Sequence, residues 1–275
     1  MEYQALIIDH IRDENREIMI AELSAMGFDS FTENEQGMEA FIPLGDYSEK
    51  EVSAYLNRKR EQLEFSYRLE RIREQNWNAI WESQYEPVLI AEKCLIRAPF
   101  HDPVAGMIYD LVIEPRMSFG TAHHETTSLM LEALLNETLT GKCLLDLGCG
   151  TGVLAILAWK MGASRVDAID NDLWAFENAM DNVAKNNAEG ISVIHGDAGD
   201  IPRKDYHLIL ANINRNILLQ DLEVYASSLA SEGVLLLSGF YEEDLLFIKG
   251  KAEEYKLQFI QSASRNRWVC AKFLK

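Results

Sequence analysis

The sequence Cys143-Leu144-Leu145-Asp146-Leu147-Gly148-Cys149-Gly150-Thr151-Gly152 decides the fold of this chain. An apolar run breaks into alternating glycines, and apolar residues then resume, which is typical of a buried strand, a tight turn and a helix. Glycines let the backbone approach a ligand closely, and the free N–H groups at the start of the helix face that ligand. The stretch therefore predicts a site for a nucleotide cofactor.

The spacing of the glycines indicates which cofactor the turn holds. A dinucleotide-binding turn reads G-x-G-x-x-G, whereas the glycines here are Gly148, Gly150 and Gly152. Asp146 precedes them, and its carboxylate would repel a pyrophosphate but attract the ammonium and sulfonium groups of S-adenosylmethionine. Asp170 ends a second short strand about 20 residues further on, where a ribose diol would be bound. The alternative is two ordinary strand-end acids beside a glycine turn.

Length and charge limit the class of protein. With 275 residues the chain exceeds the usual size of one domain, so we expect two. A formal net charge of −18 argues against direct nucleic-acid binding, because proteins that bind phosphate backbones carry a basic face. The acidity favours a basic protein partner, although solubility alone accounts for it equally well.

The sequence also predicts a cytoplasmic protein without membrane association. No stretch approaches the roughly 18 uninterrupted apolar residues of a membrane span, and the N-terminus carries Asp, Glu and Arg where a secretory signal needs an apolar core. The four cysteines form no CxxC pair and no metal-ligand spacing. We expect them to be reduced and structural.

Residues 1–73 predict a small α+β domain. Four strands are expected, at 3–10, 28–33, 37–44 and 65–69. Asp13 is expected to cap a helix whose Ile18 and Leu23 face inward, and a capping box at Ser48 begins a second helix. The order β-α-β-β-α-β is that of a ferredoxin-like domain. Such a fold carries no chemistry by itself, so we expect it to dock the substrate.

Residues 74–86 and 87–275 make up the rest of the predicted organisation. Trp77, Trp81 and Tyr85 recur at helical spacing and predict a linker helix over 74–86. In the domain 87–275, strands alternate with helices beyond the glycine turn, which predicts a Rossmann-like, doubly wound α/β sheet. Two further strands, at 257–263 and 268–273, would close the sheet as an antiparallel hairpin. This ending distinguishes methyltransferase sheets from dehydrogenase sheets.

Three further segments contribute candidate site residues. Asp197 and Asn212 end the third and fourth strands of the sheet, at the edge where such sheets bind ligands. The loop from Phe119 to Thr127 lies one helix upstream of the glycine turn, where it would fold over the cofactor. We expect no metal site at His123 and His124, because adjacent histidines on a regular element do not face one ion and no third ligand is evident.

These residues resemble the bacterial ribosomal protein L11 methyltransferases over nearly the whole chain. The glycine motif is shared by many methyltransferases, but the Phe119-Gly120-Thr121 loop with His124 and the strand end Ala211-Asn212-Ile213 are far more selective. The resemblance implies a protein methyltransferase that uses S-adenosylmethionine and methylates lysine amines, and also an N-terminal amine, of ribosomal protein L11. That basic substrate would be bound free or on the ribosome.

The resemblance also implies roles for individual residues. The family's cofactor contacts fall by motif on Thr127, Gly148, Asp170 and Asn212. With the loop, the rest of the turn and the other strand-end acids, the full expected cofactor site is Phe119, Gly120, Thr127, Asp146, Gly148, Gly150, Gly152, Asp170, Asp197 and Asn212. Asp170 would hold the ribose and Asp197 the adenine. Asn212 is the expected catalytic residue, because its carboxamide, with a nearby backbone carbonyl, would orient the substrate amine toward the methyl group.

Two departures from the family pattern bear on the site. Ala122 replaces a usual glycine, which makes a positive φ harder at that position. The segment Ile213-Asn214-Arg215-Asn216 is bulkier and more polar than the family's Ile-Leu and small residues. Both changes would affect loop closure or substrate fit without touching the four carried-over contacts.

Two other functions remain open from the residues. One is methylation of a glutamine amide or of an adenine amino group, for which the motif would be Asn/Asp-Pro-Pro-aromatic rather than Asn212-Ile213-Asn214-Arg215. The other is a scaffold that binds the cofactor without catalysis, against which the intact Asp146, Asp170 and Asn212 count.

Overall fold

The structure is a computed structural model that describes residues 2–34, 37–72, 85–116 and 118–275. The chain divides into two compact units, Met1–Gln84 and Tyr85–Lys275. The linker helix expected over 74–86 falls mostly outside the described residues, and Tyr85 and Glu86 are not helical.

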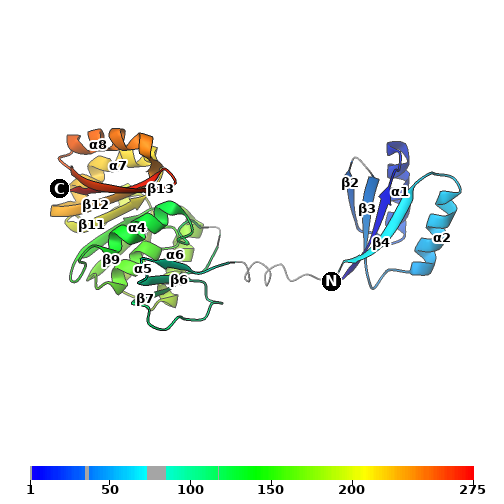
Figure 1. The fold of residues 1–275 in the computed structure, drawn as a ribbon, viewed down its shortest axis with the longest axis horizontal. Helices are drawn as coiled ribbons and strands as arrows, with labels where there is room; N and C mark the ends of the chain where they lie inside the picture. The colour runs from blue at the N-terminus through cyan, green and yellow to red at the C-terminus, as the bar shows by residue number, and fades with distance from the viewer. Residues whose placement is uncertain (1, 35–36, 73–84, 117) are drawn as a thin grey trace. The chain divides into compact units, whose positions relative to one another are not determined.

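The N-terminal unit has the predicted ferredoxin-like arrangement (Figure 1). Its antiparallel sheet has the order β2-β3-β1-β4. The strands are β1 (Tyr3–Asp9), β2 (Ser30–Asn34), β3 (Gly37–Pro43) and β4 (Ser66–Ile72). Apolar side chains from the sheet form one core with those of α1 (Asp13–Ala25) and α2 (Glu49–Arg60). Ser48 caps α2 as predicted, since its hydroxyl accepts a hydrogen bond from the Glu51 N–H.

The start of α1 differs from the prediction. Arg12 occupies the cap position and makes no side-chain cap bond, so Asp13 is the first helical residue. Met19 and Leu23, which lie four residues apart on one helix face, are fully buried. Ile18 lies on a different face and is 52% exposed. The prediction that Ile18 faces the core was therefore wrong.

The second unit contains a seven-stranded sheet of order β10-β9-β8-β11-β12-β14-β13. The first five strands in that order are mutually parallel, and β14 is antiparallel to both of its neighbours. The strands are β8 (Cys143–Leu147), β9 (Arg165–Asp170), β10 (Ile191–His195), β11 (Tyr206–Asn212), β12 (Leu229–Tyr241), β13 (Gln258–Arg265) and β14 (Trp268–Leu274). The predicted doubly wound sheet with a closing hairpin is confirmed.

Helices cover both faces of this sheet (Figure 1). One core lies under α4 (Glu125–Leu135), α5 (Val153–Lys160) and α6 (Leu173–Lys185). The other lies under α7 (Arg215–Ser228) and α8 (Leu245–Glu254). The helix α8 was not predicted. None of the helices in the described part of the chain has both the length and the apolar character of a membrane span.

A small second sheet precedes the loop that begins at Ser118. It consists of β5 (Val88–Ile90), β6 (Cys94–Arg97) and β7 (Tyr109–Val112). Buried asparagines of α6 bind the chain that leaves β7: Asn186 exchanges two hydrogen bonds with the Val112 backbone, and Asn182 accepts one from the Glu114 N–H. Asn182 also donates to the Thr151 carbonyl. One helix therefore fixes both the glycine turn and the segment that approaches it.

Candidate functional site

The glycine turn joins β8 to α5 at the carboxyl edge of the sheet. Gly148, Gly150 and Gly152 all have left-handed backbone conformations, with φ of 64°, 55° and 76°. A side chain at Gly150 is excluded on a second ground, because its Cβ would lie 2.2 Å from the carbonyl oxygen of Phe119. The missing side chain thus makes room for the backbone of a distant loop.

That loop is fastened to the turn by Thr151. The Thr151 N–H donates to the Phe119 carbonyl over 2.9 Å, and its hydroxyl donates to the Gly120 carbonyl over 2.6 Å. At the far end of the loop, Ser128 donates to the carbonyl of Ala122. Ala122 adopts a φ of 68° despite its side chain, so the replacement of the usual glycine leaves the positive φ in place. The segment 118–124 is called the cofactor loop below.

Asp170 is held at the end of β9 by two backbone donors. Its Oδ2 accepts a hydrogen bond from the Gly150 N–H over 2.8 Å, and its Oδ1 accepts one from the Asp172 N–H over 3.0 Å. These bonds fix both oxygens and leave each with lone pairs for a further donor. Asp170 also borders a cavity, where a diol can reach it.

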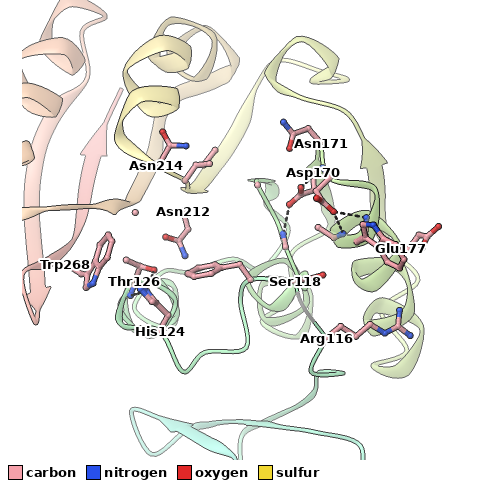
Figure 2. Close-up of a pocket in the computed structure, with 18 residues that line it drawn as sticks. Arg116, Ser118, His124, Thr126, Asp170, Asn171, Glu177, Asn212, Asn214 and Trp268 are labelled. Carbon is pink, nitrogen blue, oxygen red and sulfur yellow. Dashed lines mark hydrogen bonds between the residues drawn. The ribbon is translucent and has the colours of Figure 1, made fainter. Parts of the chain in front are cut away.

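The cavity has a volume of about 930 Å³, which is ample for a nucleoside cofactor together with a substrate side chain. Figure 2 shows Asp170 and Glu177 on one side and Asn212, His124 and Trp268 on the other. The lining residues are Arg116, Ser118, Phe119, His124, Thr126, Gly148, Gly150, Asp170, Asn171, Asp172, Trp174, Ala175, Glu177, Asn212, Ile213, Asn214, Gly239 and Trp268.

The side-chain amide of Asn212 has a hydrogen-bond partner for its nitrogen but none for its oxygen among the described residues. Its Nδ2 donates to the hydroxyl of Thr127 over 3.4 Å. Its Oδ1 is buried and has no hydrogen-bond partner among the described residues. A buried carbonyl oxygen without a donor is costly, so this atom would gain from a hydrogen bond to a ligand N–H. Asn212, which carries this unpartnered oxygen, lines the cavity.

The structure brings half of the ten expected cofactor residues to the cavity wall. These are Phe119, Gly148, Gly150, Asp170 and Asn212. The other five do not line the cavity: Gly120 and Gly152 belong to the backbone of the loop and the turn, Thr127 is the partner of Asn212, and Asp146 and Asp197 are described next. Thr126, the neighbour of Thr127 on α4, lines the cavity instead.

Asp146 lies beneath the turn and is only 1% exposed. Its Oδ2 accepts a hydrogen bond from the Ala155 N–H in the first turn of α5, while its Oδ1 has no partner in the described chain. Burial raises the pKa of this carboxyl to about 8. With such a pKa the carboxyl is largely neutral at pH 7 and attracts a cation less than a carboxylate would. The charge contact expected for Asp146 stays a prediction.

Asp197 forms a local cap instead of lining the cavity. Its carboxylate accepts a hydrogen bond from the Gly199 N–H, and its own N–H donates to Asp200. These bonds form the capping box of a short 3-10 helix, Ala198–Asp200. The contact of Asp197 with the adenine also stays a prediction.

An aromatic wall at the Asn212 end of the cavity was missed by sequence reasoning. The His124 ring lies 5.1 Å from that of Phe119 and 4.9 Å from that of Trp268, and Trp268 packs on Tyr241 at 4.0 Å. The only signal for His124 was its place in the selective loop. Trp268 carried none beyond being the first residue of an expected strand.

Contacts between the closing hairpin and α4 place this wall. The hairpin tip is bonded to the helix by Asn266, which donates to Glu125, and by Arg265, which pairs with Glu132. His124 caps the same helix, since its Nδ1 accepts a hydrogen bond from the Thr126 N–H. The contacts of the hairpin with α4 therefore bring Trp268 against His124. The wall is a product of tertiary packing.

The chemistry of these groups fits S-adenosylmethionine. Three features suit a nucleoside. They are the Asp170 carboxylate, which can accept from a diol, the glycine turn, which has no side chains in the way, and the exposed Trp174 at the rim of the cavity. The buried oxygen of Asn212 and the aromatic wall lie at the other end of the cavity (Figure 2).

Comparisons with known proteins agree with this architecture. The family described as ribosomal protein L11 methyltransferase (PrmA) matches residues 5–275. Ribosomal protein L11 methyltransferases are 45% identical over 262 residues in Porphyromonas gingivalis and 40% identical over 261 residues in Bacteroides fragilis. Both alignments span 94% of this chain, and they span 90% and 93% of those proteins, respectively.

Solved structures give the same result. The ribosomal protein L11 methylase of Lactobacillus delbrueckii subsp. bulgaricus superimposes with a TM-score of 0.64 at 26% identity, covering 69% of this chain and 98% of that one. A methyltransferase from Pyrococcus furiosus shares the fold at a TM-score of 0.52 and 20% identity, covering 60% of this chain and 89% of that one. This chain belongs to the ribosomal protein L11 methyltransferase family.

Proposed function

We propose that this protein transfers methyl groups from S-adenosylmethionine to amines of ribosomal protein L11, namely lysine side chains and the N-terminal amine. The observation that carries the proposal is the buried, unpartnered Oδ1 of Asn212 at the edge of the cavity that also contains the Asp170 carboxylate. One end of the cavity then suits a nucleoside, and the other suits a group with an N–H to donate.

The cofactor end is supported by Asp170, Gly148 and Gly150. S-adenosylmethionine supplies a methyl group that its sulfonium already activates. Asp170 accepts from the ribose hydroxyls with the lone pairs that its two backbone bonds leave free. The turn lets the ligand lie against the backbone, and the cofactor loop, held by Thr151, excludes water from one side.

The acceptor end is supported by Asn212 and the aromatic wall. An amine is protonated at neutral pH, with an ordinary pKa of about 10.4, and only its neutral form has a lone pair for the methyl group. The rings of Phe119, His124 and Trp268 present weakly polar surface at this end, and desolvation of an amine bound there would favour its neutral form. Asn212 accepts one N–H and thereby aims the nitrogen lone pair along the line of transfer.

The N-terminal unit is the proposed docking site for the protein substrate. Its helix α1 exposes Ile18 beside the acidic residues Glu14 and Glu17. Such a surface complements a basic protein. Glu17→Lys should raise the KM for intact ribosomal protein L11 and leave the affinity for the cofactor unchanged. An unchanged KM would remove α1 from the docking surface.

Labelled transfer tests the proposal directly. The full-length protein is incubated with methyl-labelled S-adenosylmethionine and ribosomal protein L11, and the modified residues are mapped by mass spectrometry. Methyl groups on amines, lost in Asp170→Ala and in Asn212→Ala, are the expected result. Transfer to a glutamine amide of that protein would instead support the alternative function of an amide methyltransferase.

A further inference from the structure

Two histidines hold consecutive carbonyls at the start of the second unit. The Nε2 of His101 lies 2.7 Å from the Tyr85 carbonyl oxygen, and the Nε2 of His123 lies 2.9 Å from that of Glu86. Because a carbonyl only accepts hydrogen bonds, Nε2 carries the proton and donates in both rings. The Tyr85 ring packs against both imidazoles, with centroid distances of 6.1 Å and 4.7 Å. Residues 85–86 are called the entry segment.

The two histidines come from different parts of the unit. His101 belongs to the turn after β6, where its Nδ1 accepts a hydrogen bond from the Ala98 N–H over 3.1 Å. His123 belongs to the cofactor loop, where its Nδ1 lies 3.1 Å from the hydroxyl of Thr121. His123, together with Thr121, whose side chain is hydrogen-bonded to Tyr85, therefore joins the entry segment to the loop that borders the cavity, whereas His101 does not belong to that loop.

The connection continues without a gap to the glycine turn. The cofactor loop contains His123 at one end and, at the other, the carbonyls of Phe119 and Gly120 that Thr151 binds. The loop between them is short and strained at Ala122, whose φ is 68°. A displacement of one end of such a segment is not absorbed by its middle, because Ala122 is buried and bonded to Ser128.

We infer that His123 is a positioning residue that couples occupancy of the cavity to the entry segment Tyr85–Glu86. The inference rests on the proposed function, since it requires S-adenosylmethionine to bind beside Phe119 and Gly150. A ligand that holds the cofactor loop against the glycine turn also fixes His123, and His123 fixes the Glu86 carbonyl. By linkage, any partner that holds the entry segment raises the affinity for the cofactor by the same factor.

Hydrogen exchange of the full-length protein, with and without S-adenosylhomocysteine, tests the coupling. In the wild type this product is expected to slow amide exchange in the cofactor loop and also in a peptide over Tyr85–Ile90. His123→Ala should reduce the slowing at Tyr85–Ile90, where the bond of Thr121 to Tyr85 remains, and weaken binding of the product about fivefold, the effect of losing one hydrogen bond. His123→Gln, which keeps an N–H donor, should restore part of both.

His101→Ala is the matched control, because it removes the same kind of bond from the neighbouring carbonyl. It should speed exchange of the entry segment but keep the slowing caused by the product, with unchanged affinity. Equal slowing at Tyr85–Ile90 in His123→Ala and in the wild type would overturn the coupling while leaving the proposed function intact. A wild type that binds no product would overturn both.

A milder variant keeps the test decisive if His123→Ala does not fold by circular dichroism. Thr121→Val removes the hydroxyl that holds the second imidazole nitrogen of His123 and that also bonds to Tyr85, and it leaves the histidine itself. The product should then slow exchange at Tyr85–Ile90 less than in the wild type. Slowing equal to that of the wild type would again contradict the coupling.

Discussion

Asn212 and Thr127 form a hydrogen bond of 3.4 Å between the end of β11 and the first turn of α4, and this bond turns the Asn212 carbonyl oxygen away from Thr127. Thr127 is 1% exposed and does not line the cavity. In this structure Thr127 therefore acts as a partner that orients Asn212, and its expected contact with the cofactor stays a prediction.

Substitution of Asn212 or Thr127 is expected to slow methyl transfer and to leave the affinity for the cofactor unchanged. Asn212→Ala should lower kcat about 100-fold, because the amine is no longer aimed. Thr127→Val keeps the shape of the side chain but loses the hydroxyl, so it should give a smaller fall in kcat. Steady-state kinetics and equilibrium titration with S-adenosylmethionine measure the two effects. Ser227→Ala, at an exposed position of α7 that does not line the cavity, should keep the wild-type kcat.

A side chain at Gly150 is expected to disrupt both the turn and the cofactor loop. Gly150→Ala places a Cβ 2.2 Å from the Phe119 carbonyl oxygen, in addition to the strain of a φ of 55°. Gly141→Ala has a similar positive φ of 76° and no atom within 4 Å, so it isolates the backbone strain. That strain costs about 1–2 kcal/mol. Urea denaturation should show a larger loss for Gly150→Ala, and only this variant should lose cofactor binding.

The charge of Asp170 is expected to matter more for binding than that of Asp197. Asp170→Asn puts an N–H group against the Gly150 or the Asp172 donor and weakens the grip on the diol, so the Kd for S-adenosylmethionine should rise about 10-fold to 100-fold. Asp197→Asn keeps an acceptor for the Gly199 N–H at a residue outside the cavity wall. Its Kd should stay close to that of the wild type. An equal rise would show that Asp197 contacts the adenine.

Asp146 is expected to make stability depend on pH. Its pKa is raised by burial from 3.8 to about 8, so the folded protein binds one more proton than the unfolded chain between these values. The stabilisation by the neutral carboxyl is complete below pH 3.8 and is lost as the pH rises through about 8. Asp146→Asn keeps an acceptor for Ala155 and does not ionise.

Denaturation at about pH 5 and about pH 8 checks this expectation. The free energy of unfolding of Asp146→Asn, relative to the wild type, should rise between the two pH values. The exposed Asp102→Asn serves as the control and should follow the wild type at both. A constant difference for Asp146→Asn would mean that this carboxyl is already ionised in the folded protein.

Ala122 is expected to be a site of stored strain. Ala122→Gly removes the penalty of a Cβ at a φ of 68° and should raise the free energy of unfolding by about 1 kcal/mol. Ala133→Gly, in the last turn of α4, should lower it by up to about 1 kcal/mol. Thermal denaturation of the two variants should therefore shift in opposite directions.

The sequence predicted those parts of the fold that local patterns encode. The glycine turn, the alternation of strands and helices and the capping box at Ser48 each rest on neighbouring residues, and the structure contains all of them. The helix α8 was missed because its sequence shows little amphipathic pattern: Leu246 and Phe247 are 77% and 67% exposed. Gly250 further weakens the helical signal.

The site was predicted as far as motifs reach along the chain. Asp170 and Asn212 were found because each ends a strand of a sheet that binds ligands at that edge. Trp268 was not predicted. It reaches the cavity because its hairpin, β13 and β14, is bonded to α4, which lies more than 130 residues earlier in the chain. Asp146 was placed in the right motif, but only its burial shows that it lies behind the turn.

The position of β14 has a consequence for the order of events during synthesis. This strand lies between β12 and β13, yet it follows both along the chain. The sheet therefore stays split until Trp268–Leu274 have left the ribosome, whereas the N-terminal unit has all of its strands much earlier. Because Trp268 also forms part of the cavity wall, a nascent chain lacks a finished cavity until that strand is inserted.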